Sequence, residues 1–144
     1  MNQKNALVIE QFRANNGIVT VVPPRGPVLL LHTWGRKTGA ERVTPLMYLQ
    51  DGDRQVIFAS MGGWRRNPDW YHNLVADPNV TVEVGTEVYN AIAVEVHGEE
   101  RERLYDTMAA QFSQFALYKK KTKRLIPVIF LQRKAAASDH PSSV

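Results

Sequence analysis

The sequence predicts a mainly β (α+β) domain, a small antiparallel barrel of six strands with few helices. β-branched and aromatic residues, which favour strands, are enriched in six runs: residues 28–34, 43–49, 55–60, 80–84, 88–96 and 126–132. Short turn segments such as Asp51-Gly52-Asp53 and Gly85-Thr86 separate neighbouring runs, so those strands are expected to be antiparallel. The chain has no series of alternating strands and helices, which disfavours a parallel doubly wound sheet.

The two ends of the chain are expected to flank this barrel. Apolar residues recur at helical spacing in residues 3–15, which predicts an amphipathic N-terminal helix. Residues 17–27 contain three prolines and are expected to form an extended connection. We expect residues 1–134 to form one domain and residues 135–144 to form a flexible C-terminal tail.

Two further helices are expected between the strands. The first runs from Pro68 to Ala76, with Asn67 as its N-cap and Pro68 at its first position. The second spans about residues 99–112 and continues toward Tyr118. Glutamates occupy its first turn, where the helix dipole favours acids.

Composition excludes several classes of function. The chain has no cysteine, so it has no disulfide, no thiolate nucleophile and no cysteine-ligated metal. Its four histidines include no pair at metal-ligand spacing, and no metal is expected. No apolar run approaches the ~18 residues of a membrane span, and the N-terminus is unlike a secretory signal, so a cytoplasmic protein is expected. No Ser–His–Asp or paired-carboxylate pattern stands out, so a cofactor would have to perform the difficult step of a reaction.

The basic charge points to an anionic ligand. The formal net charge is +4, and several cations lie inside glycine-rich turns, not along a helix face. This distribution favours a bound small anion over a nucleic acid. A nucleic-acid-binding barrel that uses residues 119–124 and exposed aromatic side chains stays as an alternative.

Two segments could hold such a ligand. The first, from Gly35 to Arg42, combines two glycines, three cations and a hydroxyl, and backbone N–H groups of such a turn can bind phosphate. A solvated hairpin tip is its alternative. The second, from Ser60 to Pro68, joins a strand to a helix N-terminus, which favours anionic groups, although taken alone it is better explained as a plain connection needing glycines. Trp70 is a possible wall for a planar ring or a core tryptophan.

Three aromatic residues follow at regular spacing near the end of the last helix. Phe112, Phe115 and Tyr118 recur every three residues, which places them along one side of a helix or tight turn. They are expected to line a substrate pocket or to belong to the core. The basic run from Lys119 to Arg124 suits the solvated C-terminal end of a helix.

Together these segments resemble the deazaflavin (coenzyme F-420)-dependent nitroreductase family, the class A coenzyme F-420-dependent reductases of actinobacteria. The resemblance covers about residues 28–133. It is carried by Gly-Arg-Lys-Thr-Gly, Arg42-Val43-Thr44-Pro45-Leu46, Ala59-Ser60-x-Gly62-Gly63, Asn67-Pro68-x-Trp70-Tyr71-x-Asn73-Leu74 and Arg124-Leu125-Ile126-Pro127-Val128. It implies a split β-barrel of the FMN-binding type and the reduced coenzyme as cofactor, with FMN as the alternative.

The resemblance also implies roles for individual residues. Those expected at the phosphate and polyglutamate tail are Arg36, Lys37, Thr38 and Arg42. Those expected around the deazaflavin ring are Val43, Thr44, Pro45, Leu46, Met47, Ala59, Ser60, Met61, Asp69, Trp70, Tyr71, His72 and Asn73. Those expected at the substrate are Trp70, Phe112, Phe115 and Tyr118. Ser60 is expected to position cofactor or substrate, and Tyr118 or solvent to supply a proton.

Two departures from the family pattern bear on the reaction. Met61 stands where many relatives have lysine, and Phe112 and Phe115 stand where the nitroreductase archetype has tyrosines. The lost hydroxyls argue against nitro reduction and favour hydride transfer to an activated alkene, such as an α,β-unsaturated ester, a coumarin-like lactone or an enone. The alternatives are quinone or nitroaromatic reduction, an FMN oxidoreductase and a non-catalytic cofactor-binding protein. We expect a small planar lipophilic substrate, no nucleic acid, no stable membrane insertion and a monomer.

Overall fold

Residues 3–20 and 26–134, which the computed structural model describes, contain seven strands, four α-helices and one short 3-10 helix. In chain order these are α1 (Gln3–Ala14), β1 (Val28–Trp34), β2 (Glu41–Met47), β3 (Leu49–Asp51), β4 (Arg54–Phe58), η1 (Met61–Gly63), α2 (Asp69–Ala76), β5 (Asn79–Val84), β6 (Glu87–Val96), α3 (Gly98–Gln111), α4 (Gln114–Lys121) and β7 (Val128–Arg133). The expected tail at residues 135–144 and part of the proline-rich connection, residues 21–25, lie outside the described residues.

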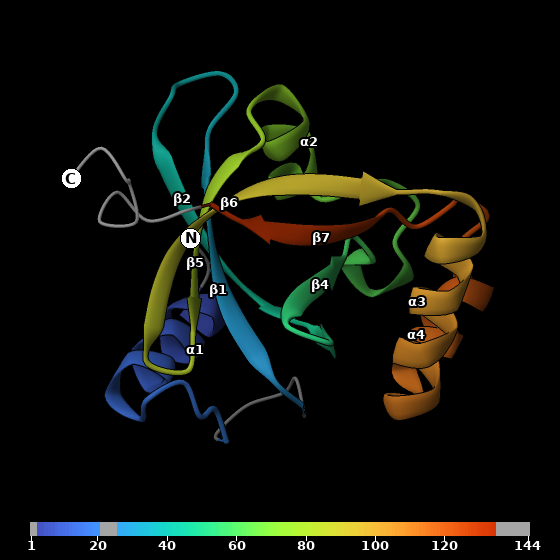
Figure 1. Cartoon of the computed structure of the whole chain (residues 1–144), viewed down its shortest axis with the longest axis horizontal. Helices are drawn as coiled ribbons and strands as arrows, with labels where there is room; N and C mark the ends of the chain where they lie inside the picture. Colours follow the sequence, from blue (N-terminus) through green and yellow to red (C-terminus); the bar gives the residue numbers. More distant parts are fainter. Residues whose placement is uncertain (1–2, 21–25, 135–144) are drawn as a thin grey trace, which may run out of the picture.

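All seven strands belong to one curled antiparallel sheet in the order β2-β1-β5-β6-β7-β4-β3 (Figure 1). β6 is long enough to serve two partners, since its first part pairs with β5 and its last part with β7. β2 and β3 are separated in sequence by Tyr48 alone, yet they lie at opposite edges of the sheet. The chain therefore links the two edges directly, as expected for the predicted barrel.

One predicted strand is two strands in the structure, which is why the sheet has seven and not six. The predicted strand 43–49 begins earlier, at Glu41, and its ladder with β1 ends at Met47. Tyr48 donates its N–H to the Pro27 carbonyl oxygen at 3.2 Å, and Leu49 then pairs with Val56 of β4. The residue types favour strand throughout this run and carry no sign of the change of partner.

β1 is buried on both of its faces. Val28 and Leu30 belong to an apolar cluster to which α1, α3 and α4 contribute, and Leu29 and Leu31 belong to a second cluster that α2 closes. These four residues are at most 4% exposed. A strand buried on both faces is a continuous apolar run and not an alternating one, as residues 28–31 are.

The helices follow the prediction with two corrections (Figure 1). Asn67 is not the N-cap of α2, because Pro68 occupies that position with an extended backbone and the Asn67 side chain accepts a hydrogen bond from Arg124. The last predicted helix is divided into α3 and α4, because the backbone is extended at Phe112, with φ −132°. No helix in the described part of the chain has the length and apolar character needed to cross a bilayer.

Acid should destabilise this fold through two carboxylates that hold elements together. Hydrogen bonds from arginines, chiefly Arg103 on Asp51 and Arg13 on Glu83, lower the pKa of both carboxyl groups. Their contribution to stability is therefore present above the unfolded pKa and is lost as the pH falls through the lower folded pKa. We expect the free energy of unfolding in urea to fall by about 1–2 kcal/mol from this source between about pH 5 and pH 3. The double variant Asp51→Asn, Glu83→Gln should have a correspondingly flatter pH profile, and an unchanged profile would contradict the assignment.

Candidate functional site

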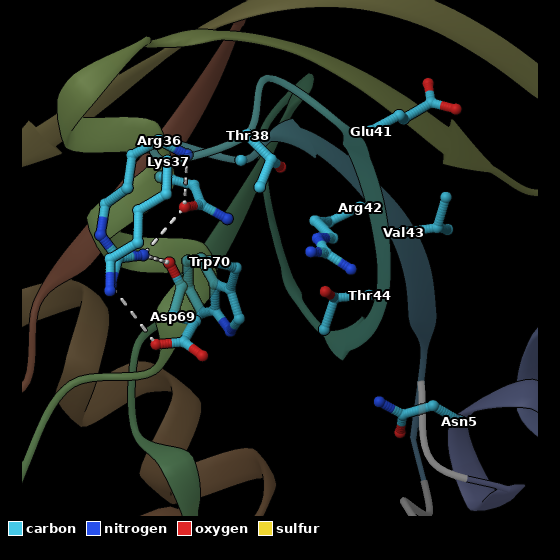
Figure 2. Close-up of a pocket in the computed structure, with 12 residues that line it drawn as sticks. Asn5, Arg36, Lys37, Thr38, Glu41, Arg42, Val43, Thr44, Asp69 and Trp70 are labelled. Carbon is cyan, nitrogen blue, oxygen red and sulfur yellow. Dashed lines mark hydrogen bonds and ion pairs between the residues drawn. The ribbon is translucent and has the colours of Figure 1, made fainter.

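A cavity of about 580 Å³ lies between the β1–β2 hairpin and α2, with Asn5 of α1 at its far side (Figure 2). Nine of the residues predicted to bind a cofactor line it: Arg36, Lys37, Thr38, Arg42, Val43, Thr44, Asp69, Trp70 and Asn73. Gly35, Glu41 and Asn5 complete the lining. The structure thus brings together the first predicted segment and the N-terminal half of α2.

The hairpin tip, residues 35–40, is a tight turn that presents the cations. Gly35 donates its N–H to the Ala40 carbonyl oxygen at 2.7 Å, and Gly39 donates to the Gly35 carbonyl oxygen, also at 2.7 Å. The Thr38 hydroxyl accepts a hydrogen bond from the Ala40 N–H at 3.2 Å. Gly39 has φ +73°, a conformation that glycine adopts without strain. The turn is therefore fixed by its own backbone, and its cationic side chains extend from it.

Arg36 fastens the hairpin tip to α2. Its Nη1 donates to Asn73 Oδ1 at 2.9 Å, and its backbone N–H donates to the same oxygen at 3.2 Å. Nη1 also lies 3.4 Å from the Asp69 carbonyl oxygen, and Nη2 lies 3.7 Å from the Asp69 carboxylate. Because Asn73 is only 5% exposed, this contact sets the distance between the two walls of the cavity.

Lys37 and Arg42 are free to bind an anion. Neither side chain has a hydrogen bond or an ion pair with any residue in ranges 3–20 and 26–134. Figure 2 shows Arg42 and Thr44 pointing into the hollow from β2, opposite Trp70. Backbone N–H groups of a glycine turn beside unpaired cations are the usual setting of a phosphate or carboxylate site.

Trp70 belongs to the core and also reaches the cavity, and its contact with a planar ring stays a prediction. Its side chain is 7% exposed and packs with Leu74 in the second apolar cluster, so it is a core residue. It also lines the cavity, where the remaining exposed part of the indole can contact a planar ring. These donors, cations and the indole fit a cofactor that combines a planar ring with an anionic tail.

The other predicted ring residues do not line this cavity. They are Pro45, Leu46, Met47, Ala59, Ser60, Met61, Tyr71 and His72. Met47 and Ala59 are buried in the core, whereas Met61 is 49% exposed. The Tyr71 hydroxyl donates to Glu95 at 2.6 Å, and burial together with this bond raises the pKa of Tyr71 to about 12. Their contacts with a cofactor stay predictions.

The second predicted segment is held in place by α4 and by Arg124. Residues 59–68 form the β4–α2 connection, in which Gly63 has φ +79° and lies so close to α4 that a Cβ would be 3.0 Å from the Tyr118 carbonyl oxygen. Arg124 donates hydrogen bonds to the carbonyl oxygens of Ser60 and Trp64 at 2.8 and 2.9 Å, and to Asn67 Oδ1 at 2.6 Å. The glycine requirement predicted for this connection is therefore real, and its geometry depends on a residue from the basic run.

The three late aromatic residues are separated by the break between α3 and α4. Phe115 is 5% exposed and packs in the core against Phe58, Tyr105 and Tyr118. Phe112 and Tyr118 are half-buried, and the Tyr118 hydroxyl has no hydrogen bond within the described ranges. None of the three lines the cavity, so their contact with substrate stays a prediction.

Sequence reasoning missed two features of this region. Arg124 was expected to be a solvated cation, but it holds the β4–α2 connection with three hydrogen bonds. His32 is not among the predicted site residues, but it hydrogen-bonds Glu41, which lines the cavity. The motif around Arg124 was the available signal for the first feature. The second depends on strand register and had no signal in the sequence.

Comparison with known proteins gives consistent results for sequence and fold. Residues 5–133 match the model of a family described as F420H(2)-dependent quinone reductase. An F420H(2)-dependent quinone reductase of Mycobacterium tuberculosis is 40% identical over 127 residues, which cover 85% of each chain. A solved F420-H2 dependent reductase (FDR-A) is 36% identical with a TM-score of 0.68, covering 80% of this chain and 100% of that chain. A solved structure described as a domain-swapped dimer is 34% identical with a TM-score of 0.70, covering 88% and 98%.

Proposed function

Because this chain belongs to the F420H(2)-dependent quinone reductase family, we propose that it reduces a quinone with reduced coenzyme F-420 bound between the hairpin tip and α2. Family membership makes the chain an oxidoreductase with a split-barrel fold and the reduced deazaflavin coenzyme as its cofactor. The observation that carries the proposed site is that Lys37 and Arg42, whose side chains have no partner among the described residues, line the same cavity as the Trp70 indole.

The chain's own residues bind and orient the coenzyme, and the bound coenzyme would supply a hydride to the substrate. Lys37, Arg42 and the hairpin N–H groups bind the anionic tail. Arg36 keeps the hairpin at a fixed distance from α2 through Asn73. Trp70 supports the ring edge. A quinone that accepts a hydride also takes up one proton to become the hydroquinone, and either Tyr118 or solvent supplies it.

The quinone replaces the activated alkene as the first candidate substrate. The relatives' names support a quinone and give no support to an unsaturated ester, lactone or enone. The apolar-pocket argument for alkenes relied on Phe112 and Phe115, and Phe115 is used in the core. Alkene and nitroaromatic reduction, an FMN-dependent reaction and non-catalytic cofactor binding are distinguished by the test below.

The direct test follows oxidation of the reduced coenzyme by purified protein. A soluble naphthoquinone, coumarin and a nitroaromatic are offered in parallel, and binding of oxidised coenzyme F-420 and FMN is measured separately. We expect tight binding of the deazaflavin and fastest turnover with the quinone. Turnover of coumarin alone would establish the alkene reaction instead. Tight binding without turnover of any acceptor would identify a cofactor-binding protein.

Neutralising the two free cations should weaken coenzyme binding without unfolding the chain. We expect Lys37→Gln and Arg42→Gln each to raise the Kd of the coenzyme by about tenfold and the double variant by about 100-fold, since each removes a charge-assisted contact. The increase should shrink at high salt. Lys123→Gln is the matched control, because Lys123 is exposed and has no ion pair in the described ranges. If the double variant binds the coenzyme as tightly as the control, the tail lies elsewhere.

We also propose that residues 1–134 act as a single domain and that the chain works as a cytoplasmic monomer. The single connected sheet supports one domain. A relative described as a domain-swapped dimer is the reason to measure the oligomeric state. Size-exclusion chromatography with light scattering over a range of concentrations decides between monomer and dimer.

A further inference from the structure

His32 of β1 lies between two carboxylates, one of which, that of Glu41, belongs to a residue that lines the cavity. Its Nδ1 is 3.0 Å from Glu41 Oε2 on β2, and its Nε2 is 2.5 Å from Glu83 Oε2 on β5. Arg13 of α1 donates to the same Glu83 carboxylate at 2.7 Å. The His32 side chain is 12% exposed, so these contacts are partly shielded from water. Residues from α1, β1, β2 and β5 thus form one connected network that includes the imidazole.

Only the charged imidazole can make both contacts. An ionised carboxylate accepts hydrogen bonds and cannot donate them, so each ring nitrogen has to carry a proton to bond both glutamates. A neutral histidine has one N–H and can keep one partner. Glu83 retains Arg13 and is 14% exposed, whereas Glu41 is 47% exposed and has no other hydrogen bond or ion pair with the described residues. Glu41 is therefore the carboxylate that neutral His32 releases.

Glu41 lies next to the cations that are proposed to bind the anionic tail. It precedes Arg42 in β2 and lines the same cavity. In Figure 2 its carboxylate points away from the hollow into which Arg42 points. With His32 charged, the four groups Arg13, His32, Glu41 and Glu83 sum to zero charge. With His32 neutral they sum to −1, and the added negative charge lies at the cavity rim.

We infer that His32 is a positioning residue: its protonated ring pairs with Glu41 and offsets the negative charge next to Arg42, so that the coenzyme's anionic tail binds more tightly when His32 is charged. The inference rests on the proposed function, because it requires the tail to lie at Lys37 and Arg42. The charged groups that face the ring are Glu41 from β2, Glu83 from β5 and, through Glu83, Arg13 from α1.

The experiment measures the Kd of oxidised coenzyme F-420 by calorimetry between about pH 5.5 and 8.5, where histidine side chains usually change charge. For the unmodified chain we expect Kd to rise by about 3- to 10-fold as the pH rises from about 5.5 to 8.5. This is the size of effect expected from one added negative charge several ångströms from a multiply charged anionic tail. His32→Gln should bind weakly at every pH. Glu41→Gln should bind tightly at every pH, and the double variant should behave like Glu41→Gln.

Glu41→Gln is also the control for ionisation of the coenzyme itself, since it leaves that ionisation intact. Equal pH dependence of Kd in the unmodified chain and in Glu41→Gln would overturn the inference. Weak coenzyme binding by the double variant would also overturn the inference, provided that thermal unfolding shows the variant to be folded. If His32→Gln does not fold, the comparison with Glu41→Gln still decides. Absence of coenzyme binding at any pH would contradict the proposed function itself, whereas tight but pH-independent binding contradicts only the role of His32.

Discussion

Replacing Arg124 with alanine is expected to lower kcat for reduction of the preferred acceptor by about 10- to 100-fold. The change removes the hydrogen bonds to the carbonyl oxygens of Ser60 and Trp64 and to the Asn67 side chain, at 2.8, 2.9 and 2.6 Å. These bonds fix the connection that leads into α2, whose first residues line the cavity. Small displacements of positioning groups cost rates of this size. Burial lowers the pKa of Arg124, but a guanidinium stays charged at neutral pH.

Two variants separate loss of geometry from loss of charge. Lys123→Ala removes a neighbouring exposed cation and should leave kcat within about twofold, because surface charges without partners contribute little. Arg124→Lys keeps the charge but cannot reach three acceptors, so it should remain impaired. Full activity of Arg124→Lys together with loss in Arg124→Ala would mean that Arg124 acts by charge alone. Steady-state kcat and the Kd of the coenzyme are measured for each variant.

Replacing Arg101 with alanine is expected to have the largest effect on stability, about 2–4 kcal/mol. Arg101 is 3% exposed, and its Nε and Nη2 donate to the Ile126 carbonyl oxygen at 3.1 and 2.8 Å. Its guanidinium also lies over the Tyr105 ring, 5.4 Å from the centroid. The alanine variant leaves a carbonyl group just before β7 without its donor and leaves a cavity beside Tyr105.

The matched control for Arg101 is Arg103 on the same helix. Its side chain is 55% exposed and its ion pair with Asp51 is 3.3 Å long. Arg103→Ala should cost no more than about 1 kcal/mol, as is usual for exposed pairs. Urea unfolding of both variants gives the comparison. Equal losses in the two variants would show that burial of Arg101 does not determine its contribution.

The strands could be predicted because their residue types and turns are local signals. The predicted strand 28–34 coincides with β1, and glycine or aspartate turns mark the ends of several others. The division of 43–49 at Tyr48 could not be predicted, because a strand that changes partner keeps the same residue preferences. The tertiary fold alone decides which neighbour each part finds.

The break in the last helix has a tertiary cause as well. No glycine or proline marks residues 112 and 113, so the sequence favours one continuous helix. In the structure the buried Tyr105 hydroxyl donates to the Phe115 carbonyl oxygen at 2.6 Å, and Phe115 turns into the core. This packing competes with helical continuity between α3 and α4.

The residues of the candidate site could be predicted from the sequence, but the contacts between them could not. The glycine turn with Arg36, Lys37 and Arg42 stands out in the sequence as an anion-binding segment. That Arg36 is engaged by Asn73 while the other two cations are free depends on how α2 packs against the hairpin. The contact between His32 and Glu41 likewise depends on the register that pairs Trp34 with Glu41.

The strand order, in which the chain changes partner at Tyr48, bears on whether the part of the chain that forms the cavity can fold by itself. Both walls of the cavity lie within residues 35–76, yet β1 takes its second neighbour, β5, and β4 its second neighbour, β7, from later in the chain. A fragment ending after α2 would retain two separate hairpins, and isolated two-stranded hairpins are marginally stable in water. Loop-closure entropy must be overcome before these distant strands pair. We therefore expect the cavity to form late in folding, only after the C-terminal half of the chain has joined the sheet.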